Sequence, residues 1–440
     1  MLKRIRISNY KSLKDVEVEL PSLAVLMGPN AVGKSNFLDA LQLLSKLATC
    51  KTLKEAFNPP YRGKPLESFS FGIGGFKELL AAESLRFAIE VDVELSSTVM
   101  ETINRQIREM KRNSPDPEES AEGEDNPARK LSTVRERYLR YRMEIEILPH
   151  SGFLRVVDEY LAALNTKGQP NQNRKPFLSR VDNRLHLRME GQAHPIYYER
   201  YLDHSILSLP HYPPHYPHLV AMRRELESWF FYYFEPRERM RATNPVKEVR
   251  HIGMMGEELA AFLNTLKVLD QRQFKAVEKA LTTLMPSIEG IEMEVNELGE
   301  VELRLREEGI PIPARILSEG TLRLLGLLAL SGAKEAPALI GFEEPENGIH
   351  PRRIQLIADL LKTRASFGET QYIVTTHSPL LPDLIPDESL FIFRKRQGVT
   401  SIQPFTSWGA LARSHTIEQA LSDGEELTTS ERLLRGDFDA

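Results

Sequence analysis

A glycine-rich stretch near the N-terminus has the residue types and spacing of a phosphate-binding loop. It reads GPNAVGKS from Gly28 to Ser35 and matches G-x-x-x-x-G-K-[ST]. An apolar run precedes it and a helix-forming run follows, so backbone N–H groups and a helix start could surround an anion, although a glycine-rich turn is the alternative. We predict that Lys34 contacts the β- and γ-phosphates of ATP and that the Ser35 hydroxyl binds Mg²⁺. The other nucleotide-binding positions are Asn30, Gly33 and Asn36.

A second candidate anion site is the sequence LSEGT at 317–321, which comes before an apolar, helix-forming run. Ser318 would supply a hydroxyl and Gly320 a close backbone approach at a helix N-terminus, where negative charge is favoured. We predict that both residues face a γ-phosphate. An ordinary helix cap uses the same residue types, so the motif alone leaves both interpretations open.

Two apolar runs further along the chain end in residues that suit hydrolysis. One is followed by Glu343 and Glu344, and the other, YIVTT, by His377. In a parallel sheet these groups would lie beside the phosphate loop. Glu343 would then support Mg²⁺, Glu344 would polarise the attacking water, and His377 would contact the γ-phosphate and order that water. Taken singly, each could be a solvated or hydrogen-bonded strand end.

The ordered set of four motifs resembles the ABC-type P-loop ATPases of the SMC, RecF and OLD-like group. The opening IRISNYKSL (5–13) resembles the first strand and turn of that group, and PENGIHP (345–351) resembles its D-loop. The resemblance implies ATP and Mg²⁺ as cofactors and hydrolysis of ATP to ADP and phosphate. It also implies a homodimer that binds ATP at its interface, because the signature of one subunit completes the site of the other.

The sequence departs from the pattern of this group at several positions. Glu343 stands where Asp is usual, Glu319 where many members have Gly, and His350 where Asp is frequent. We also identify no glutamine that would form a Q-loop. We therefore expect hydrolysis of ATP, at a rate that could be slow.

The elements that must position these residues predict an α/β fold. It would be an ABC-type ATPase head with a mixed or parallel P-loop sheet, plus an inserted α+β middle region. Strands are predicted within 1–27, at 85–96, 141–148, 291–296 and 301–306, with helices at 35–47 and in two stretches after 256. The predicted domains are 1–97 (ATPase lobe I), 98–245 (middle region), 246–406 (ATPase lobe II) and 407–440 (a polar tail).

The middle region carries no motif that assigns it a function. Residues 99–112 and 128–140 could form a short helical hairpin around the polar stretch 114–127. The aromatic run at 226–234 favours a core position over a base-stacking platform. The histidine-rich run at 211–218 favours a partner-binding loop over a metal site, since no cysteine accompanies it.

Composition restricts the setting of the protein. The 440 residues carry 57 basic and 62 acidic side chains, a net charge of −5, so DNA binding would need a local basic patch or a partner's charge. The single cysteine, Cys50, suits a reducing compartment. No apolar run approaches 18 residues, and the N-terminus lacks the apolar core of a signal peptide. These features predict a cytoplasmic protein with no membrane partner.

Three functions fit an ATPase of this kind. We favour the ATPase or sensor subunit of a prokaryotic anti-phage defence system that works with a separate effector, such as a Toprim-type nuclease. The alternative is a RecF- or SMC-like repair ATPase that binds double-stranded DNA. A transporter subunit is disfavoured because no Q-loop is found. The segment 98–140 is too short for an SMC coiled coil, and 407–440 is too short for an effector domain. Assembly beyond a dimer is left open.

Overall fold

The computed structural model describes residues 1–72, 74–112, 133–190, 194–199, 201–330, 332 and 336–407. No helix in these ranges is long and apolar enough to cross a membrane. The chain divides into two compact units that interleave along the sequence. The domain boundaries expected from the sequence stay predictions. The predicted polar tail, 407–440, lies outside the described residues from 408 on. The first unit comprises Met1–Pro21, Ala31–Trp229 and Phe393–Gln403, and the second Ser22–Asn30, Phe230–Ile392 and Pro404–Ala440.

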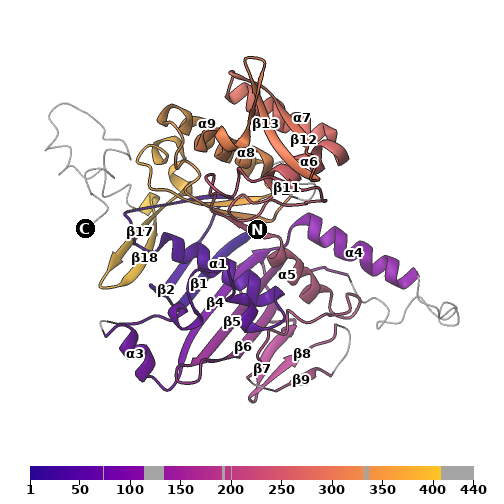
Figure 1. The fold of residues 1–440 in the computed structure, drawn as a ribbon. Coiled ribbons are helices and arrows are strands. Elements are labelled where there is room, and N and C mark those ends of the chain that lie inside the picture. The colour runs from indigo at the N-terminus through magenta and orange to yellow at the C-terminus, as the bar shows by residue number, and fades with distance from the viewer. Residues whose placement is uncertain are drawn as a thin grey trace. The chain divides into compact units, whose positions relative to one another are not determined.

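The first unit contains an antiparallel sheet with strand order β2-β1-β4-β5-β6-β7-β8-β9 (Figure 1). Side chains alternate between its two faces, so that Phe87, Ile89 and Val91 of β4 are buried on one side. The strand periodicity of the sequence therefore predicted β1, β2, β4 and β5 correctly, whereas β6, β7, β8 and β9 were not predicted. Its strands are β1 (Leu2–Tyr10), β2 (Leu13–Glu19), β4 (Leu85–Glu94), β5 (Tyr138–Leu148), β6 (Phe153–Ala163), β7 (Leu178–Val181), β8 (Arg184–Leu187) and β9 (Ile196–Tyr198).

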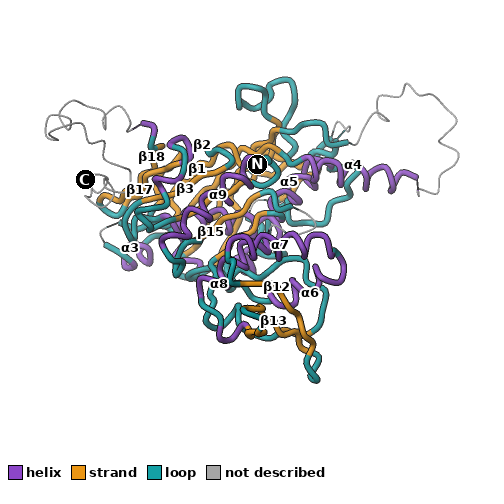
Figure 2. The backbone as a smooth tube through the Cα atoms, turned by 90° about the horizontal axis from the view of Figure 1, so that it is seen from above, coloured by secondary structure: helices purple, strands orange, loops and turns teal. Residues whose placement is uncertain are grey.

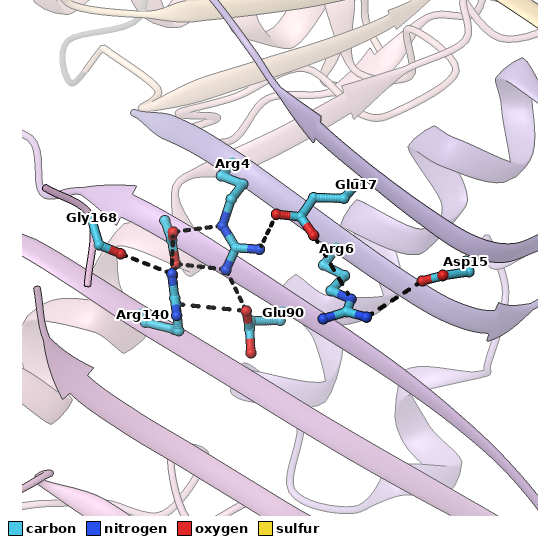
Figure 3. A network of polar contacts seen from close by, with 8 residues as sticks. Arg4, Arg6, Asp15, Glu17, Glu90, Arg140 and Gly168 are labelled. Atoms are coloured by element: carbon cyan, nitrogen blue, oxygen red, sulfur yellow. Dashed lines mark hydrogen bonds and ion pairs between the residues drawn. The ribbon is translucent and has the colours of Figure 1, made fainter. Parts of the chain in front are cut away.

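The opposite face of this sheet carries a ladder of charged side chains (Figure 3). Arg4 bonds to Glu90 and, through Nε at 2.7 Å, to Asp92, which also accepts from Arg140 Nε at 2.6 Å. Arg4 contacts Glu17 as well, at 3.0 Å. Each arginine of this cross-strand cluster therefore lies against at least one carboxylate.

Helices α1 (Lys34–Thr49) and α5 (Pro217–Glu227) of the first unit pack against each other, and Ser45 Oγ donates to Leu226 O at 2.7 Å. The predicted hairpin is correct only in its first arm, α4 (Ser97–Arg112). Of the second arm, 133–137 is not helical and 138–140 belongs to β5, because pairing with β4 overrides local helix propensity. The stretch 114–127 lies outside the described residues. The remaining helices of this unit are α2 (Leu53–Ala56), η1 (Pro65–Ser68) and α3 (Phe76–Ala81).

The second unit is built on a largely parallel sheet. The strand order is β10-β15-β16-β3-β17-β18, and β15, β16, β3 and β17 are parallel neighbours. All residues of β3 and β15 are buried, as continuous apolar runs in a parallel sheet require. The predicted α/β fold with a mixed and parallel sheet is therefore confirmed. The strands are β3 (Leu23–Met27), β10 (Trp229–Tyr232), β15 (Leu339–Glu343), β16 (Gln371–Thr375), β17 (Leu390–Arg396) and β18 (Val399–Pro404); the end of β17 and most of β18 fall in the ranges of the first unit.

The described part of the second unit also contains a small antiparallel sheet and the α-helices α6, α7, α8 and α9. α7 packs on β12, and α6 contacts β13 (Figure 2). The core collects apolar residues from α8 and the parallel sheet, including Phe342 and Leu325. The aromatic run supplies Phe234, which meets Phe342 edge to face at 4.9 Å, while Tyr233 is 42% exposed. These elements are α6 (Leu259–Leu269), α7 (Gln271–Leu284), α8 (Glu319–Leu330), α9 (Ile354–Ser366), β11 (Asn244–Pro245), β12 (Ile288–Val295), β13 (Glu300–Glu307) and β14 (Ile310–Pro313).

Candidate functional site

The phosphate loop connects β3 of the second unit to α1 of the first. Its backbone takes positive φ at Gly28 (143°), Ala31 (63°) and Gly33 (104°). Gly33 is the N-cap of α1, and no side chain caps that helix. Gly33 has no side chain that could cap the first-turn N–H groups of this 16-residue helix, which suits a phosphate as their acceptor.

The first unit surrounds Gly33 with hydroxyl groups. Thr400 Oγ1 lies 2.7 Å from Ser12 Oγ and 2.7 Å from Val32 O. Asn36 Nδ2 donates to the same Ser12 hydroxyl at 2.8 Å. A Cβ on Gly33 would fall 2.7 Å from Ser12 Oγ and even closer to Thr400 Oγ1. The loop is thus fixed by the turn between β1 and β2 and by β18, which lie far apart in sequence.

A second polar group lies beside the start of α1. Lys34 is 4% exposed, and Ser35 is half-buried. Buried Asp39 binds Lys11 at 2.7 Å and Arg62 at 2.8 Å, and Arg62 Nη2 donates to Ser35 O at 3.3 Å. The backbone of this turn is therefore held by ion pairs within the same unit.

In the second unit, the carboxyl ends of three parallel strands meet at one edge. Glu343 pairs in register with Thr375, and Thr375 with Leu26. Thr376 N donates to Leu26 O at 3.1 Å. The loop that begins at Gly28 therefore starts beside the residues that follow β15 and β16, as the sequence analysis expected of a parallel sheet.

Glu344 and His377 contact each other at this edge. His377 Nε2 lies 2.9 Å from Glu344 Oε1, with side chains 35% and 30% exposed. Glu344 has a φ of 47°, a left-handed conformation that is unusual for a residue with a side chain. Its N–H donates to Thr375 O at 3.0 Å. A carboxylate and an imidazole at this distance can share a proton and orient a water between them and a substrate.

Two further acidic residues frame this pair. Glu343 is 9% exposed at the end of β15. Glu346, in the turn after Glu344, is 7% exposed, and its burial, reinforced by the nearby charge of Glu344, raises the pKa of the carboxyl. Glu346 Oε1 accepts a hydrogen bond from Thr376 Oγ1 at 2.5 Å.

The motif at 317–321 forms the start of α8. Ser318 Oγ accepts from Thr321 N at 3.1 Å, so it caps its own helix in this chain. A Cβ on Gly320 would fall 2.8 Å from Gly348 O, so only glycine lets this helix approach the turn after Glu344 so closely. The start of α8 is held by Arg241, which donates to Leu317 O at 2.7 Å, and by Arg237, which bonds to Glu319 at 2.6 Å.

The predicted site residues are distributed over both units. Asn30, Ser318, Gly320, Glu343, Glu344 and His377 fall in the second unit, and Gly33, Lys34, Ser35 and Asn36 in the first. Of these, the structure brings Glu344 and His377 into direct contact. Glu346, Ser12 and Thr400 were not assigned from the sequence. Glu346 could have been noticed because it lies in the PENG stretch, but nothing in the sequence signals Thr400.

The proposed metal ligands fit Mg²⁺ chemically. Magnesium prefers oxygen ligands and commonly takes one or two from protein, with phosphate and water supplying the others. Ser35 and Glu343 would give one hydroxyl and one carboxylate. The described residues contain no cluster of three or more His, Cys, Asp or Glu that could hold a metal ion. Two of the three histidines at 211–218 have separate hydrogen-bond partners: His211 contacts Ile206 O and His218 contacts Glu190.

Two protein families match the chain. A family described as "AAA domain, putative AbiEii toxin, Type IV TA system" matches residues 198–383, and one described as "AAA ATPase domain" matches residues 1–124. A curated relative, the OLD nuclease of Thermus scotoductus (strain ATCC 700910 / SA-01), is 22% identical over 406 residues. That match covers 90% of this chain and 62% of the nuclease, so the chain spans less than two thirds of this relative.

Solved structures of SMC heads resemble the chain at low sequence identity. An SMC head bound to the C-winged helix domain of ScpA aligns over 91% of this chain and 97% of its own, with 13% identity and a TM-score of 0.47. The SMC head domain from Thermotoga maritima aligns over 92% and 98%, with 15% identity and a TM-score of 0.41. A head with an extended coiled coil, bound to a ScpA domain derived from Pyrococcus furiosus, covers 95% and 99%, with 12% identity and a TM-score of 0.47.

The loop geometry and the family matches define the class. The protein is a P-loop ATPase, with an AAA-type match at each of its two motif-bearing regions. Within that class it is similar to the SMC/OLD-like group, through its 22% identity to the OLD nuclease relative. This agrees with the resemblance found in the sequence.

Proposed function

We propose that the protein hydrolyses ATP with Mg²⁺ at the interface of a homodimer. The observation that carries this proposal is the contact between Glu344 and His377 at the edge where β3 leads into the phosphate loop. ATP would supply the phosphoryl group, and Mg²⁺ would neutralise the negative charge on the phosphate oxygens. The residues of the chain would bind the nucleotide, orient the attacking water and accept its proton.

Each predicted residue has a task in this mechanism. The first-turn amides of α1 and Lys34 would hold the β- and γ-phosphates, while Ser35 and Glu343 would hold the metal. Glu344 accepts the proton of the attacking water, and His377 keeps that carboxylate and the water in line with the γ-phosphate. Ser318 and Gly320 would act in trans, where a helix N-terminus faces the partner's nucleotide.

Replacing Glu344 with Gln tests the catalytic assignment. Gln keeps the shape but cannot accept the proton, so we expect ATP binding to persist and kcat to fall at least about a hundredfold, within the range for a lost general base. Turnover of ATP and binding of a labelled analogue are measured on the same preparation. Normal turnover by this variant would overturn the assignment of Glu344.

The same variant tests the dimer. With hydrolysis blocked, ATP and Mg²⁺ should hold two subunits together, and the mass in solution should double. The matched control is Glu344→Gln combined with Lys34→Ala, which should stay unshifted because it lacks the phosphate contact. A larger assembly that forms without ATP would contradict ATP-driven dimerisation.

We further propose that this ATPase is the sensor subunit of an anti-phage defence system and acts with a separate effector. The relative that supports this proposal is named a nuclease, and the match covers 62% of that protein. The alternative is a repair ATPase that binds double-stranded DNA. On the charged sheet face, Arg4 and Arg140 are bound to carboxylates, which disfavours that face as a phosphate-binding surface (Figure 3).

Adding DNA distinguishes the two roles. ATPase rate and mass are measured with and without double-stranded DNA at low and moderate salt. If the protein is a defence sensor that awaits an effector, double-stranded DNA should change neither its ATPase rate nor its mass at either salt concentration. Stimulation that falls steeply with salt would favour the repair ATPase, because phosphate contacts release counterions.

A further inference from the structure

Glu346 is a buried carboxyl whose contacts serve the loop that carries His377. It is 7% exposed, and Oε1 accepts from Thr376 Oγ1 at 2.5 Å and from Ser378 N at 3.3 Å. In the part of the chain that the structure describes, nothing donates to Oε2. Burying a carboxyl with one oxygen unpaired is unfavourable, and an apolar side chain of similar volume would avoid that cost. The carboxyl is therefore poorly explained by stability alone.

The two donors lie on either side of His377 in the sequence. Ser378 N also approaches Thr376 Oγ1 at 3.0 Å, and Thr376 N is held by Leu26 O of β3. The backbone is thus fixed immediately before and after His377. The imidazole itself projects from this fixed segment and meets Glu344 Oε1 at 2.9 Å.

The backbone of Glu346 belongs to the turn that presents Glu344. Asn347 N donates to Glu344 O at 3.0 Å, and Ile349 N donates to Glu346 O at 3.0 Å. The backbone of Glu346 therefore forms part of the turn after β15, and its side chain holds the loop after β16. These are the two segments that bring Glu344 and His377 together.

We propose that Glu346 is a positioning residue that ties the loop after β16 to the turn after β15 and so holds His377 against Glu344. It touches neither substrate nor metal in this role. The proposal deepens, and rests on, the proposed ATPase activity. It predicts that Glu346 affects the chemical step, through the geometry of Glu344 and His377, more than it affects ATP binding.

Kinetics of three variants test this role in the full chain. Glu346→Ala removes the acceptor, Thr376→Val removes its donor, and Glu346→Gln keeps an oxygen that can accept from Thr376. We expect Glu346→Ala and Thr376→Val each to lower kcat about tenfold, since a small misplacement of catalytic groups has effects of this order. KM for ATP should stay within about twofold of the wild-type value, and Glu346→Gln should keep most of the wild-type kcat. The double variant Glu346→Ala/Thr376→Val should have a kcat no lower than that of either single variant, because both changes break the same contact.

A second measurement detects the contact between His377 and Glu344 without requiring ATP turnover. The ring signal of His377, labelled with ¹³C and assigned by its loss in His377→Gln, is recorded by NMR. In the wild-type background this signal should move when Glu344 is changed to Gln, because the two side chains touch. In the Glu346→Ala background the same change should leave it in place, and in the Glu346→Gln background the response should return.

The outcomes separate this proposal from the proposed function. A wild-type protein without ATP turnover would refute the ATPase activity, while the NMR response would still decide the positioning role. If Glu346→Ala lowers kcat no more than twofold and His377 still responds to Glu344, Glu346 does not position His377. If Glu346→Ala fails to fold, Thr376→Val and Glu346→Gln answer the same question.

Discussion

Gly33 shows at the scale of one residue how the phosphate loop depends on the absence of a side chain. Its φ of 104° is a conformation that L side chains rarely adopt, and a Cβ would meet Ser12 and Thr400. We expect Gly33→Ala to weaken ATP binding at least about tenfold. The unfavourable φ angle would cost about 1–3 kcal/mol, and the overlap of the new Cβ with Ser12 and Thr400 would displace the loop. Binding of a labelled ATP analogue gives the measurement.

Gly152→Ala is the matched control for this change. Gly152 also has a positive φ, 66°, but its Cβ would meet nothing within 4 Å, and it lies in the turn between β5 and β6. This variant should lose about 1 kcal/mol of stability from the φ angle and keep ATP affinity. Equal loss of affinity in both variants would show that the loop is not specifically sensitive at Gly33.

At the scale of elements, the charged face of the antiparallel sheet makes stability depend on pH. Burial alone would raise the pKa of Asp92, but hydrogen bonds from Arg140 and Arg4 outweigh it and lower the pKa below its ordinary 3.8. This stabilisation is present above pH 3.8 and is lost as the pH falls through the lower folded-state value. We expect Asp92→Asn to cost about 2–4 kcal/mol at pH 7, as for a broken buried ion pair, and the difference from wild type to shrink in acid.

Denaturant unfolding at pH 7 and at pH 3 measures this effect. Asp15→Asn is the control on the same face, because Asp15 is 75% exposed and reaches Arg6 only at 3.6 Å (Figure 3). That exposed pair should contribute less than about 0.5 kcal/mol at either pH. A cost for Asp92→Asn that is unchanged at pH 3 would contradict the role of its ionised form.

For the whole molecule, mixing two inactive variants tests whether the site is shared between subunits. Lys34→Ala lacks the phosphate contact and Ser318→Arg lacks the signature, so a mixed dimer would keep one intact site. Random pairing makes half of the dimers mixed, so an equal mixture should recover about a quarter of wild-type ATPase activity. Steady-state ATP turnover of each variant alone and of the mixture supplies the comparison.

The control mixture combines Lys34→Ala with Glu344→Gln. Because β15 and β3 belong to one parallel sheet, Glu344 and the start of the phosphate loop come from the same chain. Both sites of the mixed dimer then stay defective, and activity should not return. Recovery in this mixture, or none in the first, would refute a site completed by the partner's signature.

Local signals allowed the sequence to predict the chemistry and most of the elements. The spacing from Gly28 to Ser35 specifies a phosphate loop because the chemistry needs a glycine turn, a lysine and a hydroxyl within one short segment. The apolar runs before Glu343 and His377 predicted two buried strands, β15 and β16, because continuous burial in a parallel sheet excludes polar residues. Periodicity likewise predicted α6, α7, β12 and β13.

Tertiary structure alone decided how distant segments support these motifs. Long-range pairing made 138–140 a strand, although its local sequence is compatible with a helix. Contacts across more than 360 residues place Thr400 on the phosphate loop, and the packing of two loops turns Glu346 toward Thr376. Such contacts leave no periodic pattern in the sequence. A motif identifies the groups that can do chemistry, and only the folded chain fixes which neighbours hold them in place.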